Sequence, residues 1–402
     1  MVKKNRSSFV NKTYLMIMLP LFYQTHLKSQ LSLAEYLFLQ ILINLLQSIK
    51  KVSLETLATA LPIPITFESR RKKIQRFLSL PNLTIENLWF PLVTTWLKTY
   101  FQPNKIVYLV LDRTAWERIN LFVISVVWEQ RAFPIYFELL PKLGSSNFDE
   151  QSCILNKVLP ILQKHQICVL GDREFCSVKL ASWLREQGVS FCLRLKKNEF
   201  VEVKNEMWLE LNHLGLSPGV SLFLKGVKVT KKKGFVGFNV ACKWKRKLRG
   251  VASKEGWFIL TNLETLELAV AAYKKRFDIE EMFRDFKSGG YNLEDTNVSG
   301  ERLISLILLI AIAYTSATIS GQQIKHKGVQ KYVGRVKEYG RTERRHSSFY
   351  IGLYGQNWVN FMEQSKDLVT KLMKLSRNKR QYYQRGLRAM ELILGSNKSL
   401  SR

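Results

Sequence analysis

The chain has 402 residues, and its balance of 46% hydrophobic and 23% charged residues excludes an intrinsically disordered protein and predicts two or three folded domains. Lys and Arg total 62 against 32 Asp and Glu, which gives a formal net charge of +30. So large an excess attracts polyanions, and nucleic acid is the favoured partner because each neutralised phosphate releases condensed counterions. The alternative partner is an anionic membrane surface.

The cysteines and the apolar runs both favour a soluble, cytoplasmic protein without a membrane partner. The five cysteines form no Cys-x-x-Cys pair, and no histidine stands at zinc-finger spacing from them, so neither disulfides nor a zinc site are expected. Two apolar runs, 14–23 and 303–313, are interpreted as buried helices. Pro20 interrupts the first, and the second is far shorter than the ~20 residues that span a bilayer.

Residues 1–100 are predicted to form a helical N-terminal domain. Apolar residues surround nearly the whole cylinder over 31–46, as in a helix packed on several sides. A short helix over 53–60, a break at two prolines and a basic helix over 67–78 are typical of a helix-turn-helix DNA reader. The alternative is a solvated basic face. The side chains expected to contact DNA are Arg70, Arg71, Lys72, Lys73 and Arg76.

From residue 105 the pattern changes to strands. A continuous β-rich run over 106–111 predicts a strand buried on both faces, and two further strands over 121–128 and 132–139 are expected to pair with it in antiparallel fashion. The helices and strands expected next lie over 150–164, 167–170, 177–187 and 190–195. This order predicts a mixed α/β sheet with helices on both faces.

Residues 196–254 alternate Val, Phe and Lys and predict a basic, β-rich insertion, for which a charged, solvated sheet edge is the alternative. One more strand is expected over 257–261, and a long helix over 266–287. The remaining residues are helical and basic in pattern. The expected division is 1–100, 101–195 with 255–320 as the sheet domain, 196–254 as the insertion, and 321–402 as a C-terminal helical region.

Two aspartates follow predicted strands directly. Asp112 ends the first strand, and Asp172 ends the fourth. In open α/β sheets ligands lie beyond the carboxyl ends of the strands, where both side chains would point. A carboxylate in such a position needs a metal ion or a positive side chain. For Asp172 the alternative is a cap on the helix that follows it.

Helical geometry selects the third acid. Four residues at offsets 0, 3, 7 and 14 of the predicted helix fall within roughly 60° of one another at ~100° per residue. These four are Tyr273, Arg276, Glu280 and Lys287. The opposite side carries Ile279, Met282 and Phe286, which are expected in the core. The alternative for the charged stripe is a solvent face with ion pairs four residues apart, such as Glu280 with Arg284.

A charged stripe combined with two strand-end aspartates matches two-metal phosphoryl transfer. Carboxylates there hold two divalent ions that clamp the attacking and leaving oxygens, and hard oxygen ligands select Mg²⁺ or Mn²⁺. Asp112, Asp172 and Glu280 are the expected catalytic residues and metal ligands. Arg276 and Lys287 would hold neighbouring phosphates.

Three motifs carry a resemblance to a known family. The pattern Tyr273-x2-Arg276-x3-Glu280-x6-Lys287 resembles the glutamate signature of DDE-type bacterial transposases of insertion-sequence family four, the YREK group. The segments 111–114 (Leu-Asp-Arg-Thr) and 171–175 (Gly-Asp-Arg-Glu-Phe) resemble its two aspartate motifs. The resemblance covers residues 105–297 well and the N-terminal helices more loosely.

The resemblance implies an RNase H-like catalytic core with a β-rich insertion between the second aspartate and the glutamate. It implies that Asp112, Asp172 and Glu280 bind the metal ions. It also implies that Tyr273, Arg276 and Lys287 grip phosphates at the transposon end. Trp257 resembles a tryptophan that stacks on a flipped base when DNA hairpins form during excision; simple core packing is the alternative.

The sequence therefore predicts a cut-and-paste DNA transposase of a bacterial cell. Its partners would be double-stranded DNA, as terminal inverted repeats and target, and a second copy of the chain, because two ends must be joined at once. The alternatives are an RNase H-like nuclease that cuts without strand transfer and a transposase-derived DNA-binding protein.

Overall fold

The computed structural model describes residues 19–103, 105–204, 207–231, 235–246, 255–340, 345–375 and 377–395. The chain divides into two compact units. The sheet unit consists of Ser29–Glu35 and Ile49–Ala311. The helical unit consists of Met1–Lys28, Tyr36–Ser48 and Ile312–Arg402. The first helices thus group with the C-terminal helices, although their position in the chain associates them with the helix-turn-helix segment.

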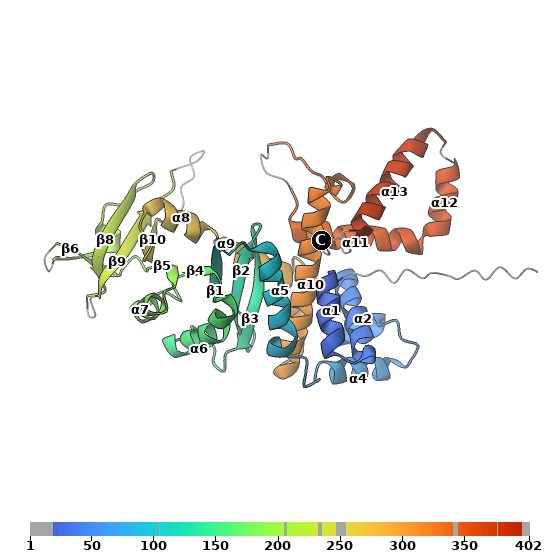
Figure 1. Cartoon of the computed structure of the whole chain (residues 1–402), viewed down its shortest axis with the longest axis horizontal. Coiled ribbons are helices and arrows are strands. Elements are labelled where there is room, and N and C mark those ends of the chain that lie inside the picture. Colours follow the sequence, from blue (N-terminus) through green and yellow to red (C-terminus); the bar gives the residue numbers. More distant parts are fainter. Residues whose placement is uncertain are drawn as a thin grey trace, which may run out of the picture. The chain divides into compact units, whose positions relative to one another are not determined.

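One mixed, ten-stranded sheet forms the sheet unit, in the order β3-β2-β1-β4-β5-β10-β9-β8-β6-β7 (Figure 1). Strands β1 (Ile106–Trp116), β2 (Ile119–Trp128) and β3 (Arg131–Leu139) form two antiparallel hairpins. Strands β4 (Gln166–Gly171) and β5 (Ser190–Arg194) follow in parallel to β1. The predicted mixed α/β fold with three initial antiparallel strands is confirmed.

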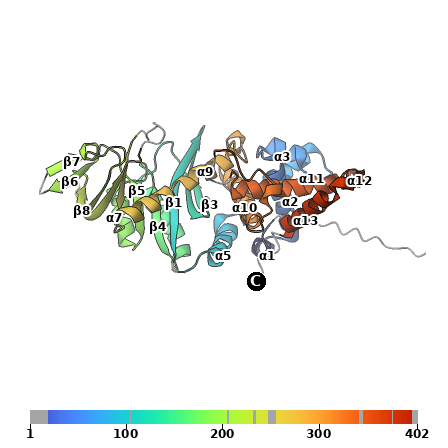
Figure 2. The same cartoon turned by 90° about the horizontal axis from the view of Figure 1, so that it is seen from above.

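The strands expected within and after residues 196–254 are also present. They are β6 (Phe200–Lys204), β7 (Met207–Glu210), β8 (Ser221–Val229), β9 (Phe235–Lys243) and β10 (Trp257–Thr261). These strands belong to the same sheet, because β10 pairs with both β5 and β9. Figure 2 shows β6, β7 and β8 beyond β5 in the same row of strands. Several basic residues of this region fall in 232–234 and 247–254, outside the described residues.

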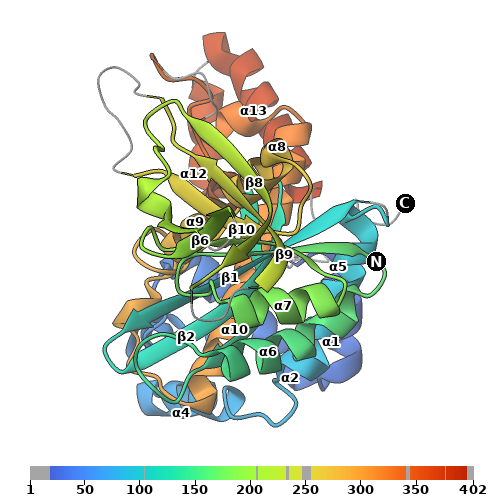
Figure 3. The same ribbon diagram turned by 90° about the vertical axis from the view of Figure 1, so that its left-hand side faces the viewer.

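Helices cover both faces of the sheet, as predicted. Figure 3 shows α6 (Phe148–Val158) and α7 (Val178–Glu186) on one face and α8 (Leu266–Lys274) and α9 (Phe277–Phe286) on the other. Helix α8 packs against β4, β5, β9 and β10, whereas α9 packs against β1, β2 and β3. Ile279, Met282 and Phe286 of α9 are buried, as their spacing predicts.

The prediction of one continuous helix over 266–287 is wrong. The helix breaks at Lys275 and Arg276, and Lys287 lies just beyond the end of α9. No proline or glycine occurs in this segment, so local sequence does not cause the break. Its two halves pack on different strands of a sheet whose strands twist relative to one another, and tertiary packing therefore interrupts the helix.

The N-terminal helices of the sheet unit agree with the predicted short helix and basic helix. Helix α3 (Leu54–Ala60) is capped by Ser53, whose side chain accepts the Thr56 backbone N–H. Helix α4 (Phe67–Phe77) is capped in the same way by Thr66. A π-helical turn (Ile85–Trp89) and α5 (Phe90–Tyr100) lead from them into β1.

The helical unit and its connections contain α1, α2 and the C-terminal helices, which confirms the helical pattern predicted for both ends. Their bounds are α1 (Leu21–Gln30), α2 (Leu33–Ile49), α10 (Glu301–His326), α11 (Ser348–Gln364), α12 (Lys366–Leu375) and α13 (Arg380–Leu394). Helices α10 and α11 cross backbone to backbone. A Cβ atom on Gly321 would lie 1.8 Å from the Ser348 carbonyl oxygen, and one on Gly352 would lie 1.8 Å from that of Ala317.

Helix α10 is longer than the apolar run 303–313 suggested, and the expectation that this run is buried is confirmed. With 26 residues it is the one single helix of the described part of the chain that is long and apolar enough to cross a membrane. Its most apolar window is 94% buried within the structure. Helices α2 and α3 meet the same criterion together, as a bent pair.

The glycine crossing yields a stability prediction. Gly321→Ala should destabilise the protein by about 1–3 kcal/mol, because the added methyl group collides with a backbone carbonyl that cannot move aside. Urea denaturation followed by circular dichroism measures the effect. Gly386→Ala is the matched control: nothing lies within 4 Å of the added Cβ, so the better helix former should stabilise α13 by about 0.5–1 kcal/mol. Equal effects of the two substitutions would contradict the close crossing.

Candidate active site

The two aspartates lie one residue beyond the parallel β1–β4 ladder. That ladder ends at the pair Leu111–Gly171, and Asp172 follows β4 directly, as predicted. Asp112, however, does not end its strand, because the hairpin with β2 extends β1 as far as Trp116. The parallel pairing rather than the strand end places both acids at the same edge.

Each aspartate is held by a nearby backbone amide. The Arg113 N–H donates to Oδ1 of Asp112 at 2.8 Å, and the Glu174 N–H donates to Oδ1 of Asp172 at 2.9 Å. Helix α7 is capped by Ser177, so the alternative that Asp172 caps this helix is wrong. Asp172 instead accepts a turn hydrogen bond, which fixes its orientation.

A buried arginine, Arg276, lies between Glu280 and Asp112. Arg276 is 6% exposed, and its Nη1 lies 3.6 Å from Oδ2 of Asp112. Its Nη2 forms an ion pair with Glu280, whose side chain is about half exposed. The alternative expected ion pairs four residues apart on a solvent face. Such a pair is present between Arg276 and Glu280, but Arg284 pairs with Glu281 instead of Glu280, and Arg276 is buried rather than on a solvent face.

Helix α9 is anchored so that Glu280 faces this edge. Arg131, at the start of β3, lies 3.5 Å from an Asp285 carboxylate oxygen and 3.3 Å from one of Glu281. The side chains of Arg131 and Asp285 are both about nine-tenths buried. Burial raises the pKa of Asp285 to about 6, with Arg131 opposing the shift. The pair therefore fixes α9 on the sheet, although the burial of both charged groups carries a desolvation penalty.

The electrostatics of Asp112 show that the three acids lie near one another. Burial, first, and then the negative charges of Asp172 and Glu280 raise the pKa of this carboxyl, and its net value is about 7. The hydrogen bond from the Arg113 amide and the positive charge of Arg276 act in the opposite direction. Residues separated by 168 positions in the chain (112 to 280) thus share one local field.

The donor set suits a hard divalent cation, although the side chains are not closed around one. Among the residues that the structure describes, no three His, Cys, Asp or Glu side chains are grouped to hold a metal ion. Arg276 instead provides the positive charge between Asp112 and Glu280. A buried carboxyl whose ionisation is opposed by two like charges is the arrangement that a divalent ion would relieve. The carboxylate oxygens themselves are ligands that Mg²⁺ and Mn²⁺ prefer.

The other members of the predicted stripe have different surroundings. Tyr273 is fully buried in α8, and its hydroxyl interacts with the guanidinium groups of Arg194 and Arg276. Its ring centre lies 5.9 Å from the Arg276 guanidinium, and burial raises the pKa of its hydroxyl. Lys287 points elsewhere, with its Nζ 2.6 Å from a Glu294 carboxylate oxygen. The structure therefore brings Tyr273, Arg276 and Glu280 together and leaves Lys287 outside.

Trp257 begins β10 and belongs to an aromatic cluster beside the arginine. Its ring stacks on Phe277 at 5.7 Å and meets Tyr273 edge-on at 5.2 Å. The Nζ of Lys245 lies 5.3 Å from its ring centre. The ring is only partly buried, so it combines packing contacts with an accessible portion. The role in base stacking stays a prediction.

Sequence reasoning missed one pair close to the acids. Arg113 and Glu174 form a two-pronged ion pair, with distances of 2.8 and 3.0 Å. The available signal was their position, because each lies within two residues of one of the aspartates in the two aspartate motifs.

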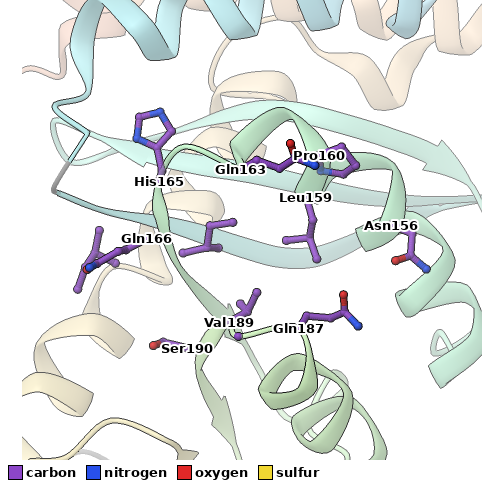
Figure 4. Close-up of a pocket in the computed structure, with 12 residues that line it drawn as sticks. Asn156, Leu159, Pro160, Gln163, His165, Gln166, Gln187, Val189 and Ser190 are labelled. Atoms are coloured by element: carbon purple, nitrogen blue, oxygen red, sulfur yellow. The ribbon is translucent and has the colours of Figure 1, made fainter.

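A separate cavity of about 720 Å³ lies at the opposite ends of the strands (Figure 4). Its lining includes Ile106, Gln166 and Ser190, the first residues of β1, β4 and β5. Amide side chains, His165 and apolar residues line it, and none of the lining residues is a carboxylate. It therefore lacks the groups needed to hold metal ions and is distinct from the acidic site.

Two of the basic side chains of helix α4 form contacts with the neighbouring helix α3. Arg70 donates from Nε to the Ala58 carbonyl at 2.7 Å, and Arg71 pairs with Glu55 at 3.1 Å. Both side chains thereby tie α4 to α3. The basic side chains at positions 72, 73 and 76 of α4 are exposed to solvent.

Comparison with known proteins finds a family model that matches part of the chain. Residues 150–316 match the family model described as a transposase DDE domain. This match indicates a transposase. It includes Asp172 and Glu280 and begins after Asp112. No curated protein matches the chain significantly.

One similar solved structure is the cryo-EM structure of a piggyBac transposase synaptic complex with hairpin DNA. The two chains share 11% sequence identity at a TM-score of 0.41. The similarity covers 86% of this chain and 78% of that chain.

The raised pKa of Asp112 predicts a pH-dependent stability difference. The pKa in the folded protein, about 7, exceeds the ordinary value of 3.8, so the folded state binds the proton more tightly and stability falls as the pH rises through this window. Asp112→Asn is neutral throughout. In the presence of a chelator it should be more stable than wild type by about 1–4 kcal/mol at pH 8, with no difference below about pH 4. Urea unfolding at both pH values checks this, and a less stable variant at pH 8 would contradict it.

The contacts of α4 predict which basic residues touch DNA. Lys72→Ala should weaken binding to duplex DNA and reduce the slope of log Kd against log salt by about one, because one phosphate contact is lost. Arg71→Ala is the control, since its guanidinium is paired with Glu55, and it should change the slope less. Fluorescence anisotropy over a salt series measures both. An unchanged slope for Lys72→Ala would remove α4 from the DNA-binding surface.

Proposed function

We propose that this transposase is a cut-and-paste enzyme whose catalytic acids are Asp112, Asp172 and Glu280. The observation that carries the proposal is their convergence: the charges of Asp172 and Glu280 both act on the buried carboxyl of Asp112. The strand order and the insertion before the glutamate helix support an RNase H-like core, as the resemblance to insertion-sequence family four implies.

The three acids would hold two Mg²⁺ or Mn²⁺ ions. When bound, such ions activate a water or a 3′ hydroxyl and stabilise the charge on the attacking and leaving oxygens. The fixed amide contacts to Asp112 and Asp172 support this role, since they orient both carboxylates in advance. Glu280 would be the acid that adjusts its position when the ions bind. Its side chain is about half exposed, and among the described residues its one ion pair is with Arg276.

Arg276 has two roles in this proposal. Without a divalent ion it neutralises Asp112 and Glu280. With the ions bound its guanidinium is no longer needed there, and its planar donors suit a phosphate at the transposon end. Tyr273 supports Arg276 from the core rather than touching DNA, because its side chain is fully buried. Lys287 would need to leave Glu294 to reach a phosphate.

The partners follow from the chemistry. The net charge of +30 and the exposed basic residues of α4 suit double-stranded DNA, both as terminal repeats and as target. Joining two ends in one reaction calls for a homodimer on DNA, and a bacterial cytoplasm is the expected location. Excision through hairpin ends would use the accessible portion of Trp257 to stack on an extruded base.

A cleavage and strand-transfer assay tests the proposal. The substrate is DNA that carries the gene's own terminal inverted repeats, with Mg²⁺ present. Glu280→Gln should lower cleavage and joining by more than about a hundredfold and leave DNA binding unchanged, because it removes a proposed metal ligand and the ion pair with Arg276 but no residue proposed to contact DNA. Glu281→Gln is the matched control: the same substitution, one residue along the same helix, removes pairs with Arg284 and Arg131 and should retain most activity.

The products separate the alternatives. Joined molecules from wild type and none from Glu280→Gln support the transposase. Cut ends without joined molecules favour a nuclease, and tight binding without cleavage by either protein favours a DNA-binding role. Equal activity of Glu280→Gln and Glu281→Gln would remove Glu280 from the catalytic set.

A further inference from the structure

The Arg113–Glu174 pair lies between the two aspartate motifs. Nε of Arg113 donates to one Glu174 carboxylate oxygen at 2.8 Å, and Nη2 donates to the other at 3.0 Å. The side chains are 18% and 16% exposed. Because both oxygens are engaged by a planar guanidinium, the pair fixes direction as well as distance.

The same two residues also hold the acids through their backbones. The Arg113 N–H donates to Asp112, and the Glu174 N–H donates to Asp172. Side chains of consecutive strand residues point to opposite faces, so Arg113 lies behind the face that carries Asp112. The ion pair therefore joins the two segments that present the acids without entering the acidic site.

Backbone hydrogen bonds between β1 and β4 do not extend to the two residues that carry the aspartate side chains. The parallel β1–β4 pairing ends at Leu111–Gly171, just before the two aspartates. Beyond that point the chain after β4 leaves the sheet, whereas β1 continues along β2. The ion pair between Arg113 and Glu174 bridges the two segments where the hydrogen-bonded ladder has stopped.

The pair is itself fixed by a buried network. Nη1 of Arg113 donates to Oδ1 of Asn120 at 3.0 Å, and the Ser146 N–H donates to Glu174 at 3.1 Å. Asn120 in turn donates to the carbonyl oxygens of Lys142 and Gly144. Strand β2 and the β3–α6 loop therefore hold both partners, which leaves the pair little freedom to adjust.

We propose that Arg113 and Glu174 are positioning residues that set the separation of Asp112 and Asp172 and thereby the divalent-ion affinity of the site. The proposal rests on the proposed function, since it assumes that these acids bind the ions. Groups that orient metal ligands without touching the metal change its affinity by about 10–100-fold when they are removed.

The test measures Mn²⁺ binding to the full-length chain without DNA, by electron paramagnetic resonance of free Mn²⁺. Glu174→Gln keeps the size of the side chain and an oxygen for the Ser146 amide, but it loses the charge and one acceptor. It should bind Mn²⁺ about 10–100-fold more weakly than wild type. Glu202→Gln is the matched control, because Glu202 is 14% exposed, pairs with Lys228 at 3.0 Å and lies in β6 of the insertion. Its Mn²⁺ affinity should equal that of wild type.

Arg113→Lys provides a second, independent variant. It keeps the positive charge and cannot form the two-pronged contact, so it should also weaken Mn²⁺ binding, with thermal unfolding recorded for every variant. Reduced Mn²⁺ affinity of a protein that is still folded at the assay temperature supports positioning. Wild-type affinity in a folded Glu174→Gln or Arg113→Lys protein would overturn it, whatever the change in melting temperature.

Asp112→Asn separates this proposal from the proposed function. If wild type and Asp112→Asn bind Mn²⁺ equally, the acids do not form the ion site, and both proposals fail. If Asp112→Asn loses binding and Glu174→Gln keeps it, only the positioning role is wrong.

Discussion

A single buried guanidinium lies between two carboxylates at the edge of the sheet that carries Asp112 and Asp172. Arg276 contacts Asp112 and Glu280, and its own burial is tolerated because those two charges surround it. Burial, first, and the charges of Asp172 and Glu280 raise the pKa of Asp112 in spite of the positive charge of Arg276. Strongly shifted pKa values of this kind are typical of sites that bind cations or perform chemistry.

The position of Arg276 depends on the break between α8 and α9. A continuous helix would place Tyr273, Arg276, Glu280 and Lys287 along one face. The turn at Lys275 and Arg276 instead lets each half pack on its own group of strands. Helix α9 is then held on β3 by the pair of Arg131 with Asp285. The site therefore depends on two scaffolds, the strand edge that carries the aspartates and the anchored helix that carries Glu280.

Sequence patterns predicted most elements of the sheet, since each depends on local periodicity. The run at 106–111 and the alternating strands after it need only their own residues to be recognised, and the helix caps at Ser53 and Thr66 are equally local. The errors arose where one element's environment changes along its length. The interrupted helix and the extension of β1 beyond Asp112 both result from partners distant in the chain.

The sequence by itself determined the residue types of the site, because two aspartates at the ends of buried runs and an acid at helical spacing from an arginine are local facts. Only the tertiary structure decided which side chains meet. Tyr273 is buried, Lys287 forms an ion pair with Glu294, and Arg113 forms an ion pair with Glu174. Periodicity gives the face of an element on which a residue lies, but its partner depends on the packing of segments that no local pattern relates.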